Sequence, residues 1–350
     1  PGIAHQTREE REGRLEGLIR IHEYFAYTKY GCFARGFLTR MRKGAKPVGR
    51  DAMGIPVIHP NWSEPAEVMT DGFSLEITAK DVDALREASP KIPGEHPVAI
   101  TFLPGEDFAA RIAATRTVRE LGFEPMPHFS ARRIRSAGEF QDYLAAVVEQ
   151  AGVRRCFVVA GDPATPEGPF ATSGELIESG AFERLGITAI GIGGHPEGHP
   201  NMGQEECFAV LQAKRDAIES RGMAPLIVTQ FAFDADRVLD WLAELRRRGI
   251  DAPVRLGVPG PAGIKTLLRF AKRCGVGASA SVMTKYGVSL SRLMGSAGPD
   301  RLVDSLAEGL GPQHGPVRLH FYPFGGVART VDWINDYAAR HSRVGSKFGE

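Results

Sequence analysis

The segment 195–200, His-Pro-Glu-Gly-His-Pro, places two imidazoles and a carboxylate within six residues. Two prolines and a glycine make this segment a stiff polar loop, which is costly to order and rarely serves packing alone. It follows the apolar residues 187–193, which favour a buried strand. We therefore expect His195 and His199 to lie where a strand ends, in a binding or catalytic site.

Three further polar side chains accompany apolar segments. Glu76 lies within the apolar segment Phe-Ser-Leu-Glu-Ile. Burial there would raise the pKa of its carboxyl and make it a proton donor near neutral pH. The alternative is that Glu76 forms a structural ion pair with a basic residue. Asp162 follows an apolar segment in Ala-Gly-Asp-Pro, where it can also cap the next turn. Gln230 lies in Val-Thr-Gln-Phe, and its carboxamide can bind a ligand or satisfy backbone groups.

Short apolar segments alternate with longer amphipathic ones from about residue 73 onward. The predicted strands cover residues 73–77, 98–102, 124–128, 156–160, 187–192, 226–231, 254–258 and 317–322. The predicted helices cover residues 108–121, 137–151, 174–184, 205–221, 234–248, 262–274 and 327–341. This alternation is typical of a parallel sheet, and its length favours an α/β fold with a (β/α)8 TIM barrel over residues 71–345. A doubly wound open sheet is the alternative, but no G-x-G-x-x-G motif follows the first strand.

Functional residues of such a barrel are expected where its strands end. In chain order these positions are Glu76, Thr101, His128, Asp162, His195 to His199, Gln230, Gly257 and Tyr322. Most of these residues are polar, which packing alone does not explain. The sequence therefore predicts one polar site at the carboxyl end of the barrel.

Residues 1–70 do not share this alternation and are predicted to form a mainly helical or irregular N-terminal extension. Residues 7–24 have a charged helical pattern, an aromatic cluster follows over residues 24–33, and residues 44–66 resemble a connector. We expect the aromatic cluster to pack against the barrel or a neighbouring subunit, with a lid over the site as the alternative.

The composition is that of a soluble globular protein, with 43% hydrophobic and 24% charged residues. Lys plus Arg number 43 and Asp plus Glu 42, so there is no basic excess to indicate nucleic-acid binding. The sequence has no apolar run long enough for a membrane span and no signal-peptide pattern. Its four cysteines are widely spaced, which argues against structural zinc or a disulfide framework. We expect a cytoplasmic homo-oligomer without a metal site.

Several motifs together resemble one enzyme family. Residues 194–200, Gly-His-Pro-Glu-Gly-His-Pro, resemble the Gly-Tyr-Pro-Glu-Gly-His-Pro signature of methylenetetrahydrofolate reductases, and residues 227–234 resemble their Ile-Thr-Gln-x-Phe-Phe-Asp signature. Residues 158–163 are similar to Leu-Arg-Gly-Asp-Pro, and residues 319–322 to His-Phe-Tyr-Thr. The resemblance covers about residues 70–340. It implies a barrel enzyme that uses FAD to interconvert 5,10-methylenetetrahydrofolate and 5-methyltetrahydrofolate, with NADH or NADPH as electron partner.

The resemblance also implies roles for individual residues. Glu76 corresponds to the general acid that acts on the pterin N5 and opens the ring to an iminium. Asp162 and Gln230 correspond to residues that orient the folate, and Asp162 also lies beside the flavin. Phe270 falls where an aromatic ring packs against the folate or the nicotinamide.

The implied contacts to FAD come from strand ends and from one helix; they are Thr101, His128, Asp162, His195, His199 and Lys214. Three positions depart from the family pattern. Ala160 replaces an arginine, His195 replaces a tyrosine, and Cys207 replaces an acid that the family often carries. We therefore expect FAD to be bound differently in detail.

Two other functions stay open on the sequence. One is another flavin-dependent barrel dehydrogenase, related to proline dehydrogenases. The other is a partner-dependent subunit that binds folate or flavin. The sequence does not set the direction of the reaction, so an oxidative role in one-carbon catabolism is included.

Overall fold

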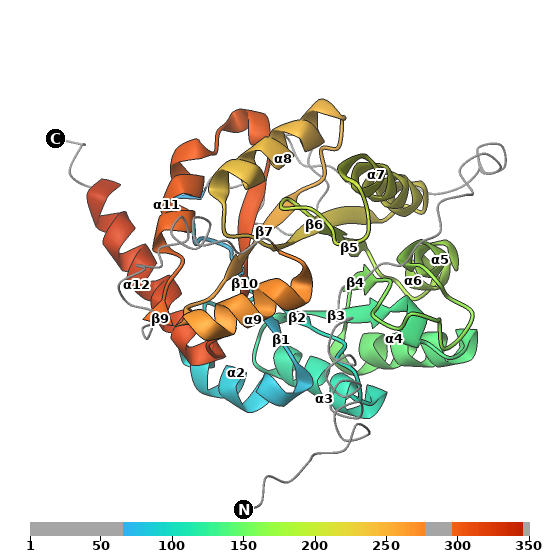
Figure 1. Ribbon diagram of the computed structural model, residues 1–350. Coiled ribbons are helices and arrows are strands. Elements are labelled where there is room, and N and C mark those ends of the chain that lie inside the picture. The colour runs from blue at the N-terminus through green and yellow to red at the C-terminus, as the bar shows by residue number, and fades with distance from the viewer. Residues whose placement is uncertain (1–65, 277–295, 346–350) are drawn as a thin grey trace, which may run out of the picture.

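Eight parallel strands form a closed barrel in the computed structural model, which describes residues 66–276 and 296–345 (Figure 1). Around the barrel the strand order is β1-β10-β7-β6-β5-β4-β3-β2. The strands are β1 Ser74–Ile77, β2 Pro97–Ile100, β3 Glu124–Ser130, β4 Arg155–Val159, β5 Ala189–Gly194, β6 Ala224–Phe231, β7 Val254–Pro259 and β10 Val317–Tyr322. The predicted TIM barrel is thereby confirmed.

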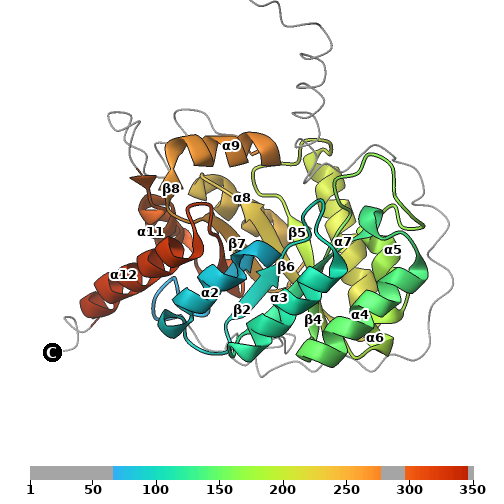
Figure 2. The same ribbon diagram turned by 90° about the horizontal axis from the view of Figure 1, so that it is seen from below.

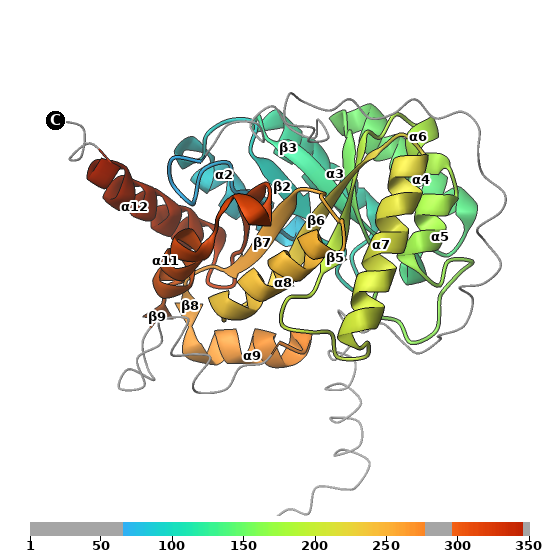
Figure 3. The same cartoon turned by 90° about the horizontal axis from the view of Figure 1, so that it is seen from above.

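Helices follow the strands and surround the barrel, while α9 lies across one of its ends (Figures 2 and 3). The helices are α2 Val82–Ala88, α3 Phe108–Glu120, α4 Ala137–Ala151, α5 Ser173–Glu178, α6 Ala181–Arg184, α7 Gln204–Ser220, α8 Ala235–Arg247, α9 Ile264–Cys274, α11 Asp300–Gly309 and α12 Val327–Gly345. A two-stranded antiparallel pair flanks α9 in the sequence: β8 Ala262–Gly263 comes directly before the helix, and β9 Ser296–Ala297 comes after it. Because α9 follows β7, it lies at the carboxyl end of the strands.

Side chains alternate between the barrel interior and the helix layer because successive residues of a strand face opposite sides. The interior holds a small apolar cluster, with Met126, Phe157 and Leu226 among its members. A larger cluster fills the space between strands and helices and includes Leu75 and Phe321. The strand segments are nearly all buried, as expected for a parallel sheet covered by helices.

All eight predicted strands are present, with ends shifted by at most two residues. The sequence analysis missed helices α2 and α11, both of them short. It also assigned residues 262–274 to one helix, whereas residues 262–263 pair with β9 and the helix begins at Ile264.

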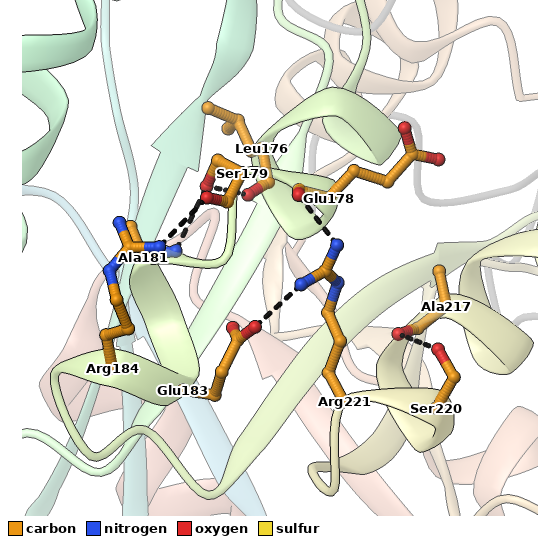
Figure 4. A network of polar contacts seen from close by, with 9 residues as sticks. All are labelled: Leu176, Glu178, Ser179, Ala181, Glu183, Arg184, Ala217, Ser220 and Arg221. Carbon is orange, nitrogen blue, oxygen red and sulfur yellow. Dashed lines mark hydrogen bonds and ion pairs between the residues drawn. The ribbon is translucent and has the colours of Figure 1, made fainter. Parts of the chain in front are cut away.

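The predicted helix over residues 174–184 is wrong as a single element, because it breaks into α5 and α6. Gly180 adopts a left-handed backbone with φ of 74° at the break, a conformation that few other residues tolerate. Figure 4 shows the polar contacts around the break. Arg184 donates to the Ser179 carbonyl, and Arg221 from the end of α7 binds Glu183 at 2.7 Å and the Glu178 carbonyl at 2.7 Å.

Of the predicted N-terminal extension, residues 1–65 lie outside the described residues, and so do the aromatic cluster and the connector. The first described residues lead directly into β1, and the Asp71 carboxylate accepts backbone N–H groups from Glu67 and Val68. The boundary between residues 70 and 71 stays a prediction. In the part of the chain that the structure describes, no helix combines the length and apolar character of a membrane span.

A substitution at Gly257 on β7 would test how tightly the barrel is packed beside the predicted site. A Cβ added there would lie 2.6 Å from the Thr229 carbonyl oxygen and 2.7 Å from that of Gln230. Because both are backbone atoms, Gly257→Ala should push β7 away from β6 and lower the free energy of unfolding by about 1–3 kcal/mol. Urea unfolding measures this change. The control Gly94→Ala, with open space around its Cβ, should stay close to wild type; equal effects of the two changes would contradict the packing argument.

Candidate functional site

Two cavities open at the carboxyl end of the barrel and share a wall. The first extends from the strand ends toward α7, and the second lies under α9. Residues lining both are Glu76, Gln230 and Tyr322. A ligand in one cavity would therefore meet a ligand in the other beside these three side chains.

The predicted site residues are divided between these cavities. His128, His195 and Lys214 line the first, whereas Thr101 and Phe270 line the second. Asp162 and His199 line neither of the two.

Glu76 lies at the wall between the cavities, on the interior face of β1. Its side chain is 15% exposed, and its Oε2 lies 3.8 Å from Nε2 of His128 and 3.7 Å from Nε2 of His320. Burial raises the pKa of the Glu76 carboxyl from 4.5 to about 7, and the nearby His128 opposes this shift. The carboxyl can thus exchange a proton near neutral pH, as the sequence analysis predicted.

The two histidines beside Glu76 are neutral at pH 7. Burial lowers the pKa of His128 to about 4 and the pKa of His320 to about 3. The contacts with Glu76 are therefore not ion pairs at neutral pH, and the structural ion pair considered for this residue is not formed with them. His320 is held by Ser74, whose Oγ lies 2.8 Å from its Nδ1, while Arg111 donates to the His128 carbonyl.

Gln230 reaches both cavities because β6 is irregular at this point. The register of β6 against β7 shifts between Val228 and Phe231, and the Tyr322 hydroxyl donates to the Thr229 carbonyl at 2.9 Å. The Gln230 Oε1 accepts the backbone N–H of Phe231 at 3.0 Å. One part of the carboxamide thus satisfies backbone, as the alternative interpretation held, and its Nε2 donors suit a ligand carbonyl.

The outer part of the first cavity contains a buried histidine and a buried lysine. His195 follows β5, and burial together with His199 and Lys214 lowers its pKa to about 3. Lys214 on α7 is 9% exposed, so its side chain is buried and not part of the solvent-facing side of the helix. Gly161, Gly193 and apolar side chains complete the walls. Cys207, at one of the departures from the family pattern, lines the same cavity.

Asp162 is bound by a residue that the sequence analysis did not single out. Arg133, in the turn after β3, donates its Nε to Oδ1 of Asp162 at 2.7 Å, and its Nη2 lies 2.5 Å from the same oxygen. Asp162 thus pairs with a partly buried arginine instead of capping the next turn. His199 packs its ring against His195 at 4.8 Å between centroids.

The glutamate between these histidines has a structural task. Glu197 accepts the backbone N–H groups of Phe233 and Asp234 at 2.7 and 2.9 Å. It thereby ties the loop after β5 to the loop after β6. In residues 66–276 and 296–345, no group of three or more His, Cys, Asp or Glu side chains is arranged to hold a metal ion.

The second cavity has an aromatic wall and a buried hydroxyl. The ring of Phe270 stacks on Phe324 with 4.0 Å between centroids and 12° between planes. The Thr101 hydroxyl is buried without a hydrogen-bond partner in the structure. Because a buried hydroxyl is costly to leave unsatisfied, Thr101 is suited to bind a polar group of a ligand in this cavity.

Comparison with protein-family models identifies the barrel. Residues 78–323 match the model described as methylenetetrahydrofolate reductase. The chain belongs to the methylenetetrahydrofolate reductase family. The matched residues begin immediately after β1, so they do not include Glu76, whose environment comes from the structure alone.

Individual relatives in this family are distant. The chain is 30% identical over 129 residues to methylenetetrahydrofolate reductase 2 of Saccharomyces cerevisiae, a match that covers 35% of this chain and 21% of the yeast protein. It is 29% identical over 153 residues to methylenetetrahydrofolate reductase (NADH) 1 of Arabidopsis thaliana, covering 38% of this chain and 24% of the plant protein. The matches thus span less than a quarter of these relatives' length.

Among solved structures, a protein from Clostridium thermocellum has a similar fold, with a TM-score of 0.54 and 13% sequence identity. The similarity covers 78% of this chain and 95% of that one. That protein is described as binding two copies of 5-methyl-5,6,7,8-tetrahydrofolic acid. At this identity the likeness concerns the fold.

His320 and Arg133 were not among the predicted site residues, and Tyr322 was named only as a strand-end position without a role. The alternation of β10 places His320 and Tyr322 on the interior face together, so the strand pattern contained a signal for both. Arg133 had no such signal, because its pairing with Asp162 depends on how two separate loops fold.

The raised pKa of Glu76 predicts how its removal changes stability. Between pH 4.5 and about 7 the folded protein binds this proton more tightly than the unfolded chain, so the Glu76 contribution falls as pH rises. The free energy of unfolding of Glu76→Gln, relative to that of wild type, should therefore be higher at pH 8 than at pH 5, by about 1–3 kcal/mol. Urea unfolding of both proteins at the two pH values measures this difference; an unchanged difference would show that the Glu76 carboxyl titrates normally.

Proposed function

We propose that this protein is a flavin-dependent oxidoreductase that interconverts 5,10-methylenetetrahydrofolate and 5-methyltetrahydrofolate. The observation that carries the proposal is the buried Glu76 carboxyl, with a pKa of about 7, at the wall that the two cavities share. Membership of the family supports the same reaction.

The first cavity fits FAD in its chemistry. Apolar walls and strand-end glycines suit a flat heterocycle, and the buried Lys214 suits an anionic group such as a diphosphate. His128, His195 and Lys214 would hold the cofactor. At position 207 the family often has an acidic residue, whereas this chain has a neutral cysteine. Without that negative charge, an anionic group is bound more easily beside Lys214. Bound FAD would supply the hydride that is exchanged with the folate.

The second cavity fits the folate. Gln230 presents amide donors to a carbonyl of the pterin, and Thr101 offers its buried hydroxyl. The stacked rings of Phe270 and Phe324 form an apolar wall for an aromatic ring of the substrate. The folate would thereby be held against Glu76.

Glu76 would handle the one proton of the reaction. Reduction of methylenetetrahydrofolate takes up a hydride and a proton, and the bond between the methylene carbon and N10 breaks. Because the methyl group stays on N5 in the product, the iminium forms on N5 and the proton from Glu76 ends on N10. The resemblance implied that Glu76 acts on the pterin N5; the balance of atoms instead puts the transferred proton on N10. The oxidative direction would need Glu76 as a carboxylate, and a pKa of about 7 permits both directions.

NADH is the electron partner that we propose first. The Arabidopsis relative is named methylenetetrahydrofolate reductase (NADH) 1. NADPH and the oxidative direction are the alternatives.

Anaerobic stopped-flow absorbance near 450 nm tests the reaction on the FAD-loaded protein. Oxidised protein mixed with methyltetrahydrofolate should lose its flavin absorbance, and Glu76→Gln should slow this at least about 100-fold, since general acid–base catalysis typically contributes that factor. Mixing with NADH should bleach both proteins equally. The control Glu120→Gln changes an exposed carboxylate on α3 and should behave as wild type.

Three outcomes count against the proposal. Equal folate rates in Glu76→Gln and wild type would remove Glu76 from the reaction. A flavin that responds to neither folate nor NADH would favour another flavin dehydrogenase. A protein that cannot be loaded with FAD would favour a partner-dependent subunit.

The same half-reaction should depend on pH through Glu76. Oxidation of methyltetrahydrofolate requires the carboxylate, so its rate should rise with pH through about 7 and level off above it. Reduction of methylenetetrahydrofolate by the prereduced protein requires the neutral acid, so its rate should fall over the same range. If the oxidation and reduction rates both rose or both fell with pH, Glu76 would not be the group that exchanges the proton.

A further inference from the structure

Three arginines face the interior of the barrel near the amino ends of their strands. Arg155 on β4 lies two residues before Phe157, a member of the interior cluster, so both side chains face inward. Arg255 on β7 and Arg318 on β10 alternate with members of the larger cluster between strands and helices, so they also face inward. We propose that these three arginines bind a tetrahedral dianion, phosphate or sulfate. The site lies at the opposite end of the barrel from the two cavities and does not depend on the proposed reaction.

Two of the three side chains meet at Gly72, just before β1. Nη1 of Arg255 donates to the Gly72 carbonyl at 2.9 Å. Nε of Arg318 lies 3.2 Å from the position that a Cβ would take at Gly72. Arg255 and Arg318 are also register partners on neighbouring strands. Two guanidinium groups thus lie together beside the seam where β1 pairs with β10.

Arg155 reaches this pair across the barrel interior. The residues in register with it on β5 and β6 are Ala189 and Ala224, whose small inward-facing side chains leave room for a long one. Burial, together with the charges of Arg155 and Arg318, lowers the pKa of Arg255 to about 9. The guanidinium groups of Arg155 and Arg318 are therefore close enough to Arg255 to repel it.

The gathering of these positive charges is costly without a compensating negative charge. Arg255 is only 3% exposed, so water screens its charge poorly. Glu124 at the start of β3 attracts Arg155 and raises its pKa, although burial lowers that pKa more. Both Glu124 oxygens are bound by Arg119 of α3, at 2.9 and 3.1 Å. This carboxylate is thus already shared with a fourth guanidinium, which leaves the arginine layer positively charged.

Arg155 has donors available for an added anion. Within residues 66–276 and 296–345 its guanidinium forms no hydrogen bond and no ion pair. Arg155 and Arg318 are partly exposed, so an ion can reach them from the amino end of the barrel. The apolar side chains of Met126 and Phe157 separate this layer from the first cavity, whose wall they form.

A tetrahedral dianion matches this arrangement of donors. A guanidinium presents paired N–H groups that suit the oxygens of phosphate or sulfate, and several guanidinium groups can bind different oxygens of one ion. Such an ion would also relieve the repulsion among the arginines. Because Arg255 holds the Gly72 carbonyl, the bound ion would stabilise the seam between β1 and β10.

Titration calorimetry of the full chain with sodium phosphate, in chloride buffer at constant ionic strength, tests the proposal. Wild type should bind about one phosphate per chain. Arg155→Met keeps a long apolar stem and should weaken the affinity at least about tenfold, since a hydrogen bond to a charged group typically contributes that factor. A separate titration with sulfate should give the same result. If Arg155→Met does not fold, Arg318→Met tests the same loss of affinity.

Two control variants locate the bound ion. Arg154→Met removes an exposed arginine next in sequence to Arg155 and should bind phosphate as wild type does. Lys214→Gln removes the buried lysine of the first cavity and should also bind phosphate normally. Loss of binding in Arg154→Met would indicate attraction by net charge, and loss in Lys214→Gln alone would place the ion in the first cavity. Either result, or no phosphate binding by wild type, would overturn the proposal.

Urea unfolding gives an independent measurement. In chloride buffer Arg155→Met should unfold at the same urea concentration as wild type or at a higher one, because the change removes repulsion. Added phosphate should raise the midpoint of wild type and leave that of Arg155→Met unchanged, since only a bound ion stabilises the folded state. Equal phosphate responses of the two proteins would contradict the site.

Discussion

The parallel pairing of β1 with β10 is the contact on which the site depends, because it closes the barrel. It aligns Ser74 with His320 and Leu75 with Phe321, so the first and last strands of the barrel pair although they are 246 residues apart in the sequence. Ser74 also binds the His320 imidazole, which leaves Nε2 of that ring facing Glu76. An open sheet would leave Glu76 at an edge in contact with water, and its carboxyl would lose the burial that raises its pKa.

Closure also explains why two cavities share one wall. Interior side chains of neighbouring strands converge at the carboxyl end, and those of β1, β6 and β10 lie between the space near α7 and the space under α9. The neutral histidines make this wall polar without adding charge. A ligand charge or proton there would interact strongly with Glu76, since little water is present to screen it.

The sequence predicted the barrel and most of the polar strand ends because both follow from periodicity. Apolar alternation gave eight strands, and the residues that end them include Glu76, His128 and Gln230. The division of these residues between two cavities could not be predicted from the sequence, because it depends on how α7, beside the barrel, and α9, across its end, pack around the strand ends. Helix α2 was missed because a helix of seven residues has too few turns for a clear pattern. The break at Gly180 was missed because the segment around it keeps a helical apolar pattern.

The pairing of Arg133 with Asp162 bears on how a divergent member keeps its site. The family pattern has an arginine at the position of Ala160, close to the aspartate in sequence, and here the partly buried Arg133 reaches Asp162 from the turn after β3. The backbone supports this arrangement, since the N–H of Arg132 donates to the Ala160 carbonyl at 2.8 Å. A carboxylate whose charge is already balanced perturbs a neighbouring flavin less than a free one would. This favours a role for Asp162 in positioning the loop after β4, and under the proposed function it leaves Glu76 as the carboxyl that would transfer the proton.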